Sequence, residues 1–188
     1  MKLSSRSLTV VAATAGALAV VAAPAAAVTA PVRATAATSV DGSSGAFTYD
    51  PTQLPVGARL SVTAVYPGNG SSIVTLHVKG AVANRDYGAH AHVAACTSSP
   101  LAAGGHFQFT PFPAGSSATD PAYANPSNEV WLDLRTDDDG NGTAKAVVPW
   151  QPGERRPMSV VVHAMPTATA PGSAGTAGAR LGCLSVGF

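Results

Sequence analysis

The stretch RLSVTAVYPGNGSSIVTLHVK, residues 59–79, contains the pattern that decides the fold class. On both sides of PGNGS, apolar and polar residues alternate, which is typical of a β-strand with one buried face. The apolar phase consists of Leu60, Val62, Ala64, Tyr66, Val74, Leu76 and Val78. A Pro-Gly-Asn-Gly turn between two such segments predicts an antiparallel β-hairpin.

More strands are predicted after this hairpin. They cover residues 89–93, 129–136, 144–150 and 158–165, and a last strand begins near Leu184. Two long segments rich in Gly, Ala, Ser and Pro, residues 96–127 and 166–179, are expected to be loops. Because no segment keeps a 3.6-residue period over ten residues, we expect an all-β fold. It would be an antiparallel sandwich or flattened barrel with two long loops.

The N-terminus has the pattern of a secretory signal peptide. Lys2 and Arg6 precede an uncharged apolar run over residues 8–23, and AAA at 25–27 fits the small-residue rule for cleavage. The alternative is a transmembrane anchor, but the run is short and rich in Ala, and no basic cluster follows it. The sequence therefore predicts a signal peptide over 1–27 and a secreted, extracytoplasmic protein.

Cleavage there would release a chain beginning near Val28, where the absence of a cysteine disfavours a lipid anchor. Residues 28–44 are Ala, Thr, Ser and Val with little pattern, and we expect them to form a flexible stem. Residues 45–188 are expected to form a single β domain. About 160 residues remain after the leader, which is enough for one domain with a hydrophobic core.

Charge and cysteine content narrow the partners and the compartment. The chain has 11 Lys and Arg against 10 Asp and Glu, a net charge of +1. Such a balance predicts no nucleic-acid partner and no membrane binding after signal cleavage. We expect a monomer or weak homodimer. The two cysteines, Cys96 and Cys183, favour one disulfide in an exported protein, and two free buried thiols are the alternative.

The five histidines suggest a metal site. His90 and His92 alternate on one strand, so they share a face about 6.5–7 Å apart at the backbone, close enough for one ion. His163 ends an apolar strand, and His106 follows a Gly-Gly pair in the first long loop. An H-x-H pair alone is a weak signal, and His77 fits an ordinary surface residue of the hairpin. Four imidazoles with few carboxylates favour copper or zinc over calcium or magnesium.

Four motifs together resemble the copper/zinc superoxide dismutase family: GAHAH followed by Cys96, GGHFQ, VVVHAM and AGTAGARLGC. The resemblance covers residues 59–188, and its most specific part is the G-x-A-G-x-R-x-x-C pattern over 175–183. It implies a Greek-key β-barrel that binds catalytic copper. The implied copper ligands are His90, His92, His106 and His163.

The resemblance also assigns individual roles. His106 takes the position of the family's bridging ligand, Arg180 that of its anion-guiding arginine, and Cys96 with Cys183 that of its disulfide. A cation beside the copper would attract an anionic substrate. The implied activity converts superoxide to oxygen and hydrogen peroxide, with Arg180 and His106 as the catalytic residues beside the copper.

The chain departs from the family where the zinc ligands are expected. No histidine lies between His106 and His163, and the family's H-x-G-D-L segment is replaced by VWLDL at 130–134. The loop over 166–179 has no charged residue, so the aspartate that links the two metal sites is missing from it. We therefore predict a copper-only member of the family, with zinc not bound.

Two acidic segments have competing interpretations. Asp133 is either an exposed strand residue or accepts a hydrogen bond from the far nitrogen of His106, and Glu129 is a weaker candidate for that task. The segment DDDGNG, residues 137–142, resembles a calcium loop. However, Arg135 and Ala146 would fall at the first and twelfth ligand positions, so a solvated hairpin turn is expected.

Two other functions compete with the dismutase. One is a copper buffer or carrier with little turnover, which the uncharged loop favours. The other is a structural β domain of the cell envelope with a vestigial metal site. The complete set of four histidines together with Arg180 argues against the structural domain.

Overall fold

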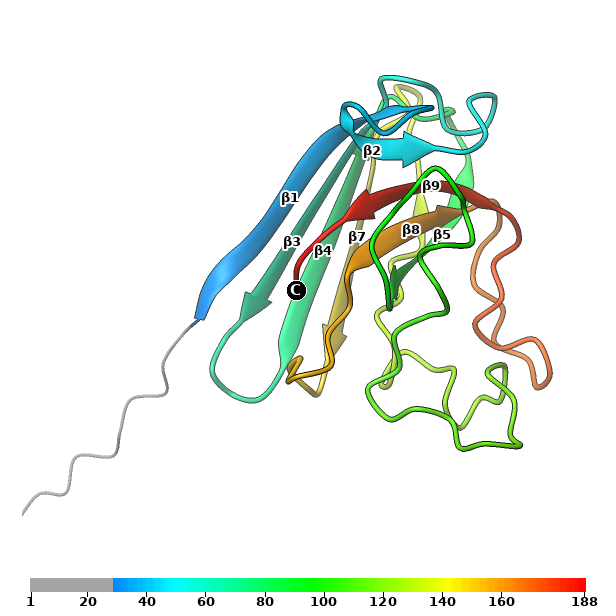
Figure 1. Ribbon diagram of the computed structural model, residues 1–188. Coiled ribbons are helices and arrows are strands. Elements are labelled where there is room, and N and C mark those ends of the chain that lie inside the picture. The colour runs from blue at the N-terminus through cyan, green and yellow to red at the C-terminus, as the bar shows by residue number, and fades with distance from the viewer. Residues whose placement is uncertain (1–28) are drawn as a thin grey trace, which may run out of the picture.

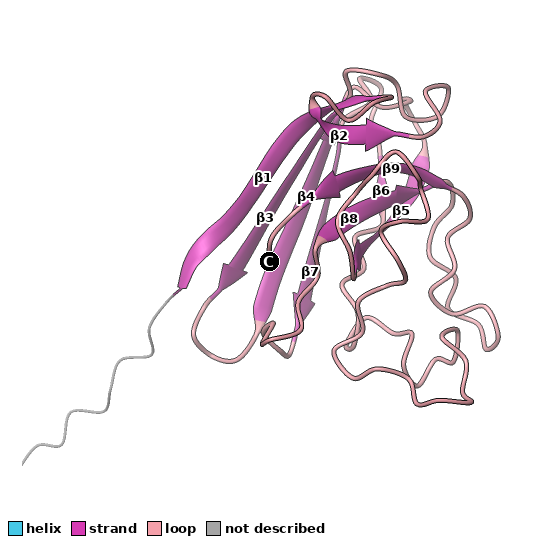
Figure 2. Cartoon of the chain, viewed as in Figure 1, coloured by secondary structure: helices cyan, strands magenta, loops and turns pink. Residues whose placement is uncertain are grey.

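A computed structural model describes residues 29–188, and within this range the chain forms strands and loops but no helix (Figure 2). It follows that the described residues contain no helix long and apolar enough to cross a membrane. The predicted signal peptide and the cleavage point before Val28 lie outside them. The strands are β1 (Thr29–Ser39), β2 (Gly45–Thr48), β3 (Arg59–Tyr66), β4 (Ser72–Lys79), β5 (Asp86–His92), β6 (Leu134–Arg135), β7 (Gly142–Val148), β8 (Ser159–His163) and β9 (Arg180–Ser185).

These strands form one sheet in the order β6-β5-β8-β9-β2-β1-β3-β4-β7. The two ends of this order, β6 and β7, follow one another in the chain, so the sheet curls until it nearly closes into a barrel. The connections from β4 to β5 and from β7 to β8 each skip over intervening strands, which is the Greek-key arrangement. The predicted all-β fold is confirmed.

The hairpin predicted from residues 59–79 is present as β3 and β4. Its register pairs Leu60 with Val78 and Val62 with Leu76, so apolar side chains face one another across the two strands. Buried and less buried residues alternate along both strands in the predicted phase. The turn between β6 and β7 is also as expected: the Asp137 carboxylate accepts hydrogen bonds from the backbone N–H groups of Asp139 and Asn141.

The segment expected to be a flexible stem contains a strand. β1 pairs antiparallel with β3 and, over Ala37–Ser39, parallel with β2, so the sheet is mixed rather than purely antiparallel. Ala36 and Thr38 are buried, whereas Arg33 and Thr35 are exposed. The alternation is real, but small Ala and Thr side chains give it too little contrast to be recognised in the sequence.

The strand predicted over residues 129–136 is mostly wrong. Only Leu134–Arg135 pair as a strand, and Trp131 forms an isolated bridge with His90. Single backbone hydrogen bonds hold the rest beside β5, such as Leu132 N–H to Ala89 O at 2.7 Å. The segment therefore runs along β5 without forming a continuous ladder.

The outer face of β5, β8 and β9 is covered rather than exposed to water. Figure 1 shows the two long loops, drawn in green and orange, beside these three strands. Val161 and Cys183 point to this outer side and pack with Ala103 of the first loop in a small cluster separate from the main core. The site described next lies on the same outer face.

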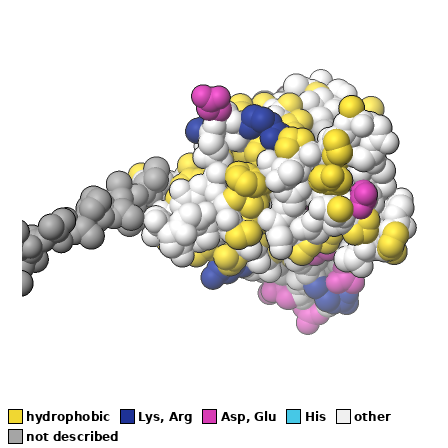
Figure 3. Space-filling model, turned by 90° about the horizontal axis from the view of Figure 1, so that it is seen from below, with side chains coloured by type: hydrophobic (Ala, Val, Ile, Leu, Met, Phe, Trp, Pro, Cys, Tyr) yellow, Lys and Arg dark blue, Asp and Glu magenta, His cyan; other side chains and the backbone are white. Residues whose placement is uncertain are grey.

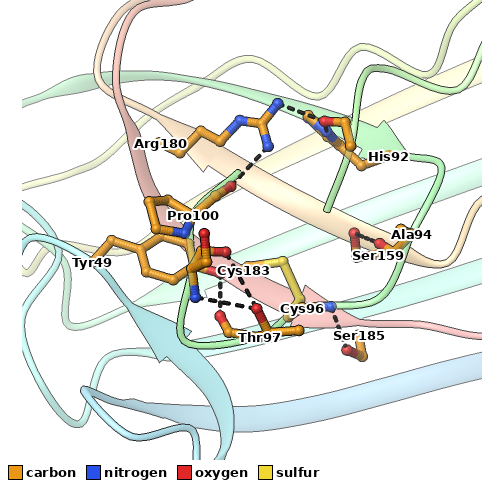
Figure 4. Close-up of a disulfide and its surroundings, with 12 residues drawn as sticks. Tyr49, His92, Ala94, Cys96, Thr97, Pro100, Ser159, Arg180, Cys183 and Ser185 are labelled. Carbon is orange, nitrogen blue, oxygen red and sulfur yellow. Dashed lines mark hydrogen bonds between the residues drawn. A yellow bond between two sulfur atoms is a disulfide. The ribbon is translucent and has the colours of Figure 1, made fainter. Parts of the chain in front are cut away.

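The predicted disulfide is present and fixes the first loop on this face. Cys96 and Cys183 are bonded with an S–S distance of 2.07 Å and a Cα–Cα distance of 5.7 Å. Close to the bridge, Cys96 N–H donates to Ser185 Oγ at 3.0 Å, and Tyr49 OH donates to Thr97 O at 2.9 Å (Figure 4). The start of the loop is thus tied to both β9 and the segment after β2.

Candidate metal centre

Four histidines meet on the outer face of β5. His90 and His92 lie on β5 itself, and pairing of β5 with β8 brings His163 opposite Gly88. His106 comes from the first long loop and forms an isolated bridge with His92. One nitrogen from each of these four imidazoles lies within 4.8 Å of the others. The structure thus brings together the four side chains predicted from the sequence.

Three of the four imidazoles are held in the same way, through Nδ1. The partners are Gly104 O for His92, at 3.0 Å, Gly178 O for His163, at 3.4 Å, and Glu129 Oε2 for His106, at 2.8 Å. Because these oxygens only accept, Nδ1 of each ring carries the proton and Nε2 keeps its lone pair. The Nε2 atoms of His92 and His163 are 3.4 Å apart.

His90 is held through its other ring nitrogen, Nε2. Its Nε2 lies 2.7 Å from the hydroxyl oxygen of Thr167, and its Nδ1 is buried without any hydrogen-bond partner. Buried polar atoms nearly always have a partner, so an unpaired ring nitrogen among three other free ring nitrogens fits a metal ion. An all-imidazole donor set suits copper or zinc.

Burial keeps three of the four imidazoles uncharged by lowering their pKa. Removal from water lowers the pKa of His90 well below its usual value, and the neighbouring imidazoles lower it further. The pKa of His92 falls to about 2 and that of His163 to about 4, again mainly through burial and next through His106. Neutral imidazoles are the form that binds metal ions, so at neutral pH no proton has to leave these three rings.

Glu129 is the carboxylate that orients His106. It is 1% exposed and accepts three hydrogen bonds: from His106 Nδ1 at 2.8 Å, Trp131 Nε1 at 2.7 Å and Gln108 Nε2 at 2.8 Å. The hypothesis that Asp133 accepts from His106 is wrong, because the side chain of Asp133 is exposed and bonded to Thr167 instead. Glu129, the weaker candidate in the sequence, performs this task.

Arg180 has both a structural contact and a place beside the site. Its guanidinium donates to Pro100 O at 2.7 Å and to Gly104 O, the same carbonyl that accepts from His92 (Figure 4). It also lines a cavity of about 440 Å³ together with His106 and His163. Phe112, Ala118 and the loop residues 174–178 complete most of its wall, so the cavity is largely apolar.

His77 lies away from the site, whereas Thr167 contacts it. His77 is exposed on β4 and bonded through Nδ1 to Thr143 Oγ1 at 2.9 Å, so its prediction as a surface residue is confirmed. Thr167 was missed, because a single threonine in a loop of Gly, Ala, Thr and Pro carries no spacing signal. Only the path of the loop over β5 brings its hydroxyl to His90.

Comparison with known proteins supports the fold and goes no further. Neither the protein-family models nor the curated proteins contain a match to this chain. Among solved structures, the crystal structure of the clock protein EA4 is similar, with a TM-score of 0.56 and 19% sequence identity. The match covers 85% of this chain and 96% of that one. At this identity the likeness concerns the fold alone.

Proposed function

We propose that this chain is a secreted copper-dependent superoxide dismutase. The observation that carries the proposal is the group of four outward-oriented imidazoles, each with its other nitrogen fixed by a hydrogen bond. Hydrogen-bond partners of the ring nitrogen that faces away from a metal set the tautomer and orientation of metal-binding histidines. Three of the four motifs that resemble the dismutase family contain these four histidines, and the fourth contains Arg180 and Cys183.

The donor set favours a single copper ion. Among residues 29–188, these four histidines are the one group of three or more His, Cys, Asp or Glu close enough to hold a metal. A second ion of the zinc type would need ligands after His106, where the chain instead places Gln108, Glu129 and Trp131 in hydrogen bonds. We therefore propose one copper per chain and no stoichiometric zinc.

The surroundings suit a small anionic substrate. Bound copper would supply the one-electron oxidation and reduction by which two superoxide ions and two protons become oxygen and hydrogen peroxide. Arg180 lines the cavity beside His106 and His163, and its charge would attract and hold superoxide there. The second loop, residues 166–179, contains no charged side chain that could share this role.

His106 is placed to handle a proton. Its side chain is 18% exposed, and it lines the cavity, whereas His90 and His92 are fully buried. Glu129 holds the proton at Nδ1, so the single lone pair of Nε2 would bind copper, and it could take up a proton for reduced substrate only while it is released from the ion. His106 would therefore serve the metal and the proton in turn.

Compartment and surface agree with a freely diffusing secreted protein. A disulfide is typical of an oxidising, extracytoplasmic environment. On the face seen in Figure 3, acidic and basic side chains lie next to one another at the lower edge, and hydrophobic ones are scattered. Such a mixed surface has no extended basic patch for nucleic acid or anionic lipid on this face.

A copper buffer or carrier of the same fold is the second candidate. The observation that favours it is the apolar wall of the cavity, which includes Ala174, Ala177 and Phe112. The second loop adds no charge to this wall. Weak steering of an anion would suit slow or no turnover. In this case the four imidazoles would bind copper with the same geometry.

Metal analysis followed by an activity assay tests the proposal. The purified protein is reconstituted with copper and zinc together, and metal content and superoxide dismutation are measured. We expect one copper, no stoichiometric zinc and copper-dependent activity. His92→Ala should lose both copper and activity, while His77→Ala, the matched change at an exposed histidine on β4, should keep both.

Each contrary result has a distinct meaning. One zinc per chain beside copper would show that the region after His106 binds a metal after all. Full copper occupancy without dismutation would favour the buffer or carrier. Equal copper content in His92→Ala and the unchanged protein would show that the four histidines do not form the copper site.

A further inference from the structure

A threonine hydroxyl lies between His90 and an acidic side chain. Thr167 Oγ1 is 2.7 Å from His90 Nε2 and 2.5 Å from Asp133 Oδ1. The backbone N–H of Thr167 donates to the other carboxylate oxygen, Asp133 Oδ2, at 2.7 Å. Three segments far apart in the sequence therefore meet: β5, the residues before β6, and the loop after β8.

The direction of each hydrogen bond follows from counting protons. An ionised carboxylate can only accept, so the single hydroxyl proton of Thr167 must go to Asp133. The oxygen of Thr167 is then left as an acceptor for His90, and His90 must carry its proton on Nε2. This assignment leaves the lone pair on Nδ1, the buried nitrogen that has no partner.

Gly88 is what lets the loop come so close. It lies on β5 two residues before His90, on the same face of the strand. A Cβ at this position would lie 2.5 Å from Met165 O and 2.8 Å from Ala177 Cβ. Because a side chain here would displace the second loop, the missing Cβ allows Thr167 to reach the imidazole.

We propose that Thr167, held by Asp133, is a positioning residue that fixes the ring of His90 and its tautomer. The pair would act on a bound metal ion only through His90. The uncharged second loop thereby has a specific role. Its Thr167 hydroxyl connects His90 to the carboxylate of Asp133, which lies outside the loop. The consequence for copper rests on the proposed function, whereas the tautomer of His90 does not.

The first test needs no metal. Nitrogen-15 NMR of the imidazoles in the metal-free protein reports which ring nitrogen of His90 carries the proton. We expect the Nε2–H tautomer in the unchanged protein and a loss of this single form in Thr167→Val, which keeps the shape of the side chain but removes the hydroxyl. A proton on Nδ1 of His90 in the unchanged protein would overturn the proposal.

The second test measures copper affinity and the copper EPR spectrum. Thr167→Val should bind copper about tenfold to a hundredfold more weakly, as changes in groups that orient metal ligands usually do. Thr167→Ser retains the hydroxyl and should restore affinity and spectrum. Thr169→Val, the same change at an exposed residue of the same loop, should behave like the unchanged protein.

The outcomes separate this inference from the proposed function. If the unchanged protein binds copper and Thr167→Val matches it in affinity, spectrum and tautomer, the positioning role is excluded. If Thr167→Ser is as weak as Thr167→Val, the hydroxyl is not the active feature and the proposal fails. If the unchanged protein binds no copper, the proposed function fails, and the NMR result alone decides the role of Thr167.

Discussion

The half of the barrel built from β3, β4 and β7 differs from the half built from β5, β8 and β9 in what covers its outer face. In β3 and β4, buried residues alternate with more exposed ones, which is the pattern of a sheet with one face in water. Every residue of β8 and nearly every residue of β5 is buried. The second half therefore has two buried faces, one toward the core and one beneath the long loops.

The difference shows how one sheet can separate stability from chemistry. The inner face is apolar in both halves, with Leu76 on one side and Val160 and Val162 on the other. Four imidazoles occupy the covered outer face, where burial lowers the pKa of His90, His92 and His163 and loop atoms hold the orientation of the rings. Changes in the first half should alter folding alone, and changes in the second should alter folding and metal binding together.

The largest effect is expected from removal of the disulfide. Cys96 and Cys183 are 87 residues apart in sequence, and closing a loop of this length stabilises by about 4–5 kcal/mol in the chain-entropy model. The double change Cys96→Ser with Cys183→Ser should lower the free energy of unfolding by about 4 kcal/mol. Because the bridge fixes the loop that supplies His106, copper affinity should fall as well. Urea unfolding and copper titration measure the two effects.

The control for this prediction is the reduced, otherwise unchanged protein, which should resemble the double variant. Unfolding midpoints that stay the same after reduction would show that the loop is held by its other contacts, such as the hydrogen bond from Cys96 N–H to Ser185 Oγ. The half built from β5, β8 and β9 would then keep its stability without the disulfide.

A core truncation in the first half should come next in size. Leu76 is fully buried on β4, so Leu76→Ala should cost about 3 kcal/mol in the free energy of unfolding. Its side chain points to the inner face, away from the imidazoles, and copper affinity at low temperature should stay unchanged. A calorimetric melt together with copper titration checks this. A parallel loss of copper affinity would contradict the separation of the two faces.

The features that could be predicted from the sequence follow the same division between the two halves of the barrel. Alternation identified β3 and β4 with their buried phases, and the H-x-H spacing placed His90 and His92 on one face. β1 was missed because Ala and Thr side chains differ too little in polarity. The strand over 129–136 was overestimated because an apolar alternation does not say whether a ladder of hydrogen bonds is completed.

The partners of the imidazoles depend on where loops travel, and local patterns do not encode this. Asp133 and Glu129 are both acidic and close in sequence, yet only Glu129 turns inward to His106. Thr167 reaches His90 because the second loop crosses β5 at Gly88. Such contacts are set by tertiary structure, so spacing alone could propose the metal ligands but not the groups that hold them.

Glu129 allows a more selective change in the second half. Three donors share its two oxygens, so Glu129→Gln places an amide N–H against at least one of them. The loss should be about 2 kcal/mol in the free energy of unfolding and about tenfold or more in copper affinity. Urea unfolding and copper titration compare it with Glu154→Gln, the same change at an exposed residue. Equal results for the two variants would leave Glu129 without a role at His106.

The smallest effect concerns Arg180 and tests the proposed activity rather than the fold. Arg180→Ala should lower the kcat/KM for superoxide severalfold, a change of about 1 kcal/mol, because the cavity loses its attracting cation. Stopped-flow dismutation at several salt concentrations, at matched copper occupancy, is the measurement. Arg180→Glu should be slower still, since repulsion replaces attraction.

The structure adds a complication that Arg180→Lys resolves. The guanidinium donates to Gly104 O, which also accepts from His92, so Arg180→Ala removes a hydrogen bond near a metal ligand as well as a charge. Lysine keeps the charge but not the planar pair of donors. If the charge guides superoxide, Arg180→Lys should retain most of the rate and its decrease with added salt, because screening weakens only the attraction. If Arg180→Lys is as slow as Arg180→Ala and neither responds to salt, Arg180 supports the loop and does not guide the substrate.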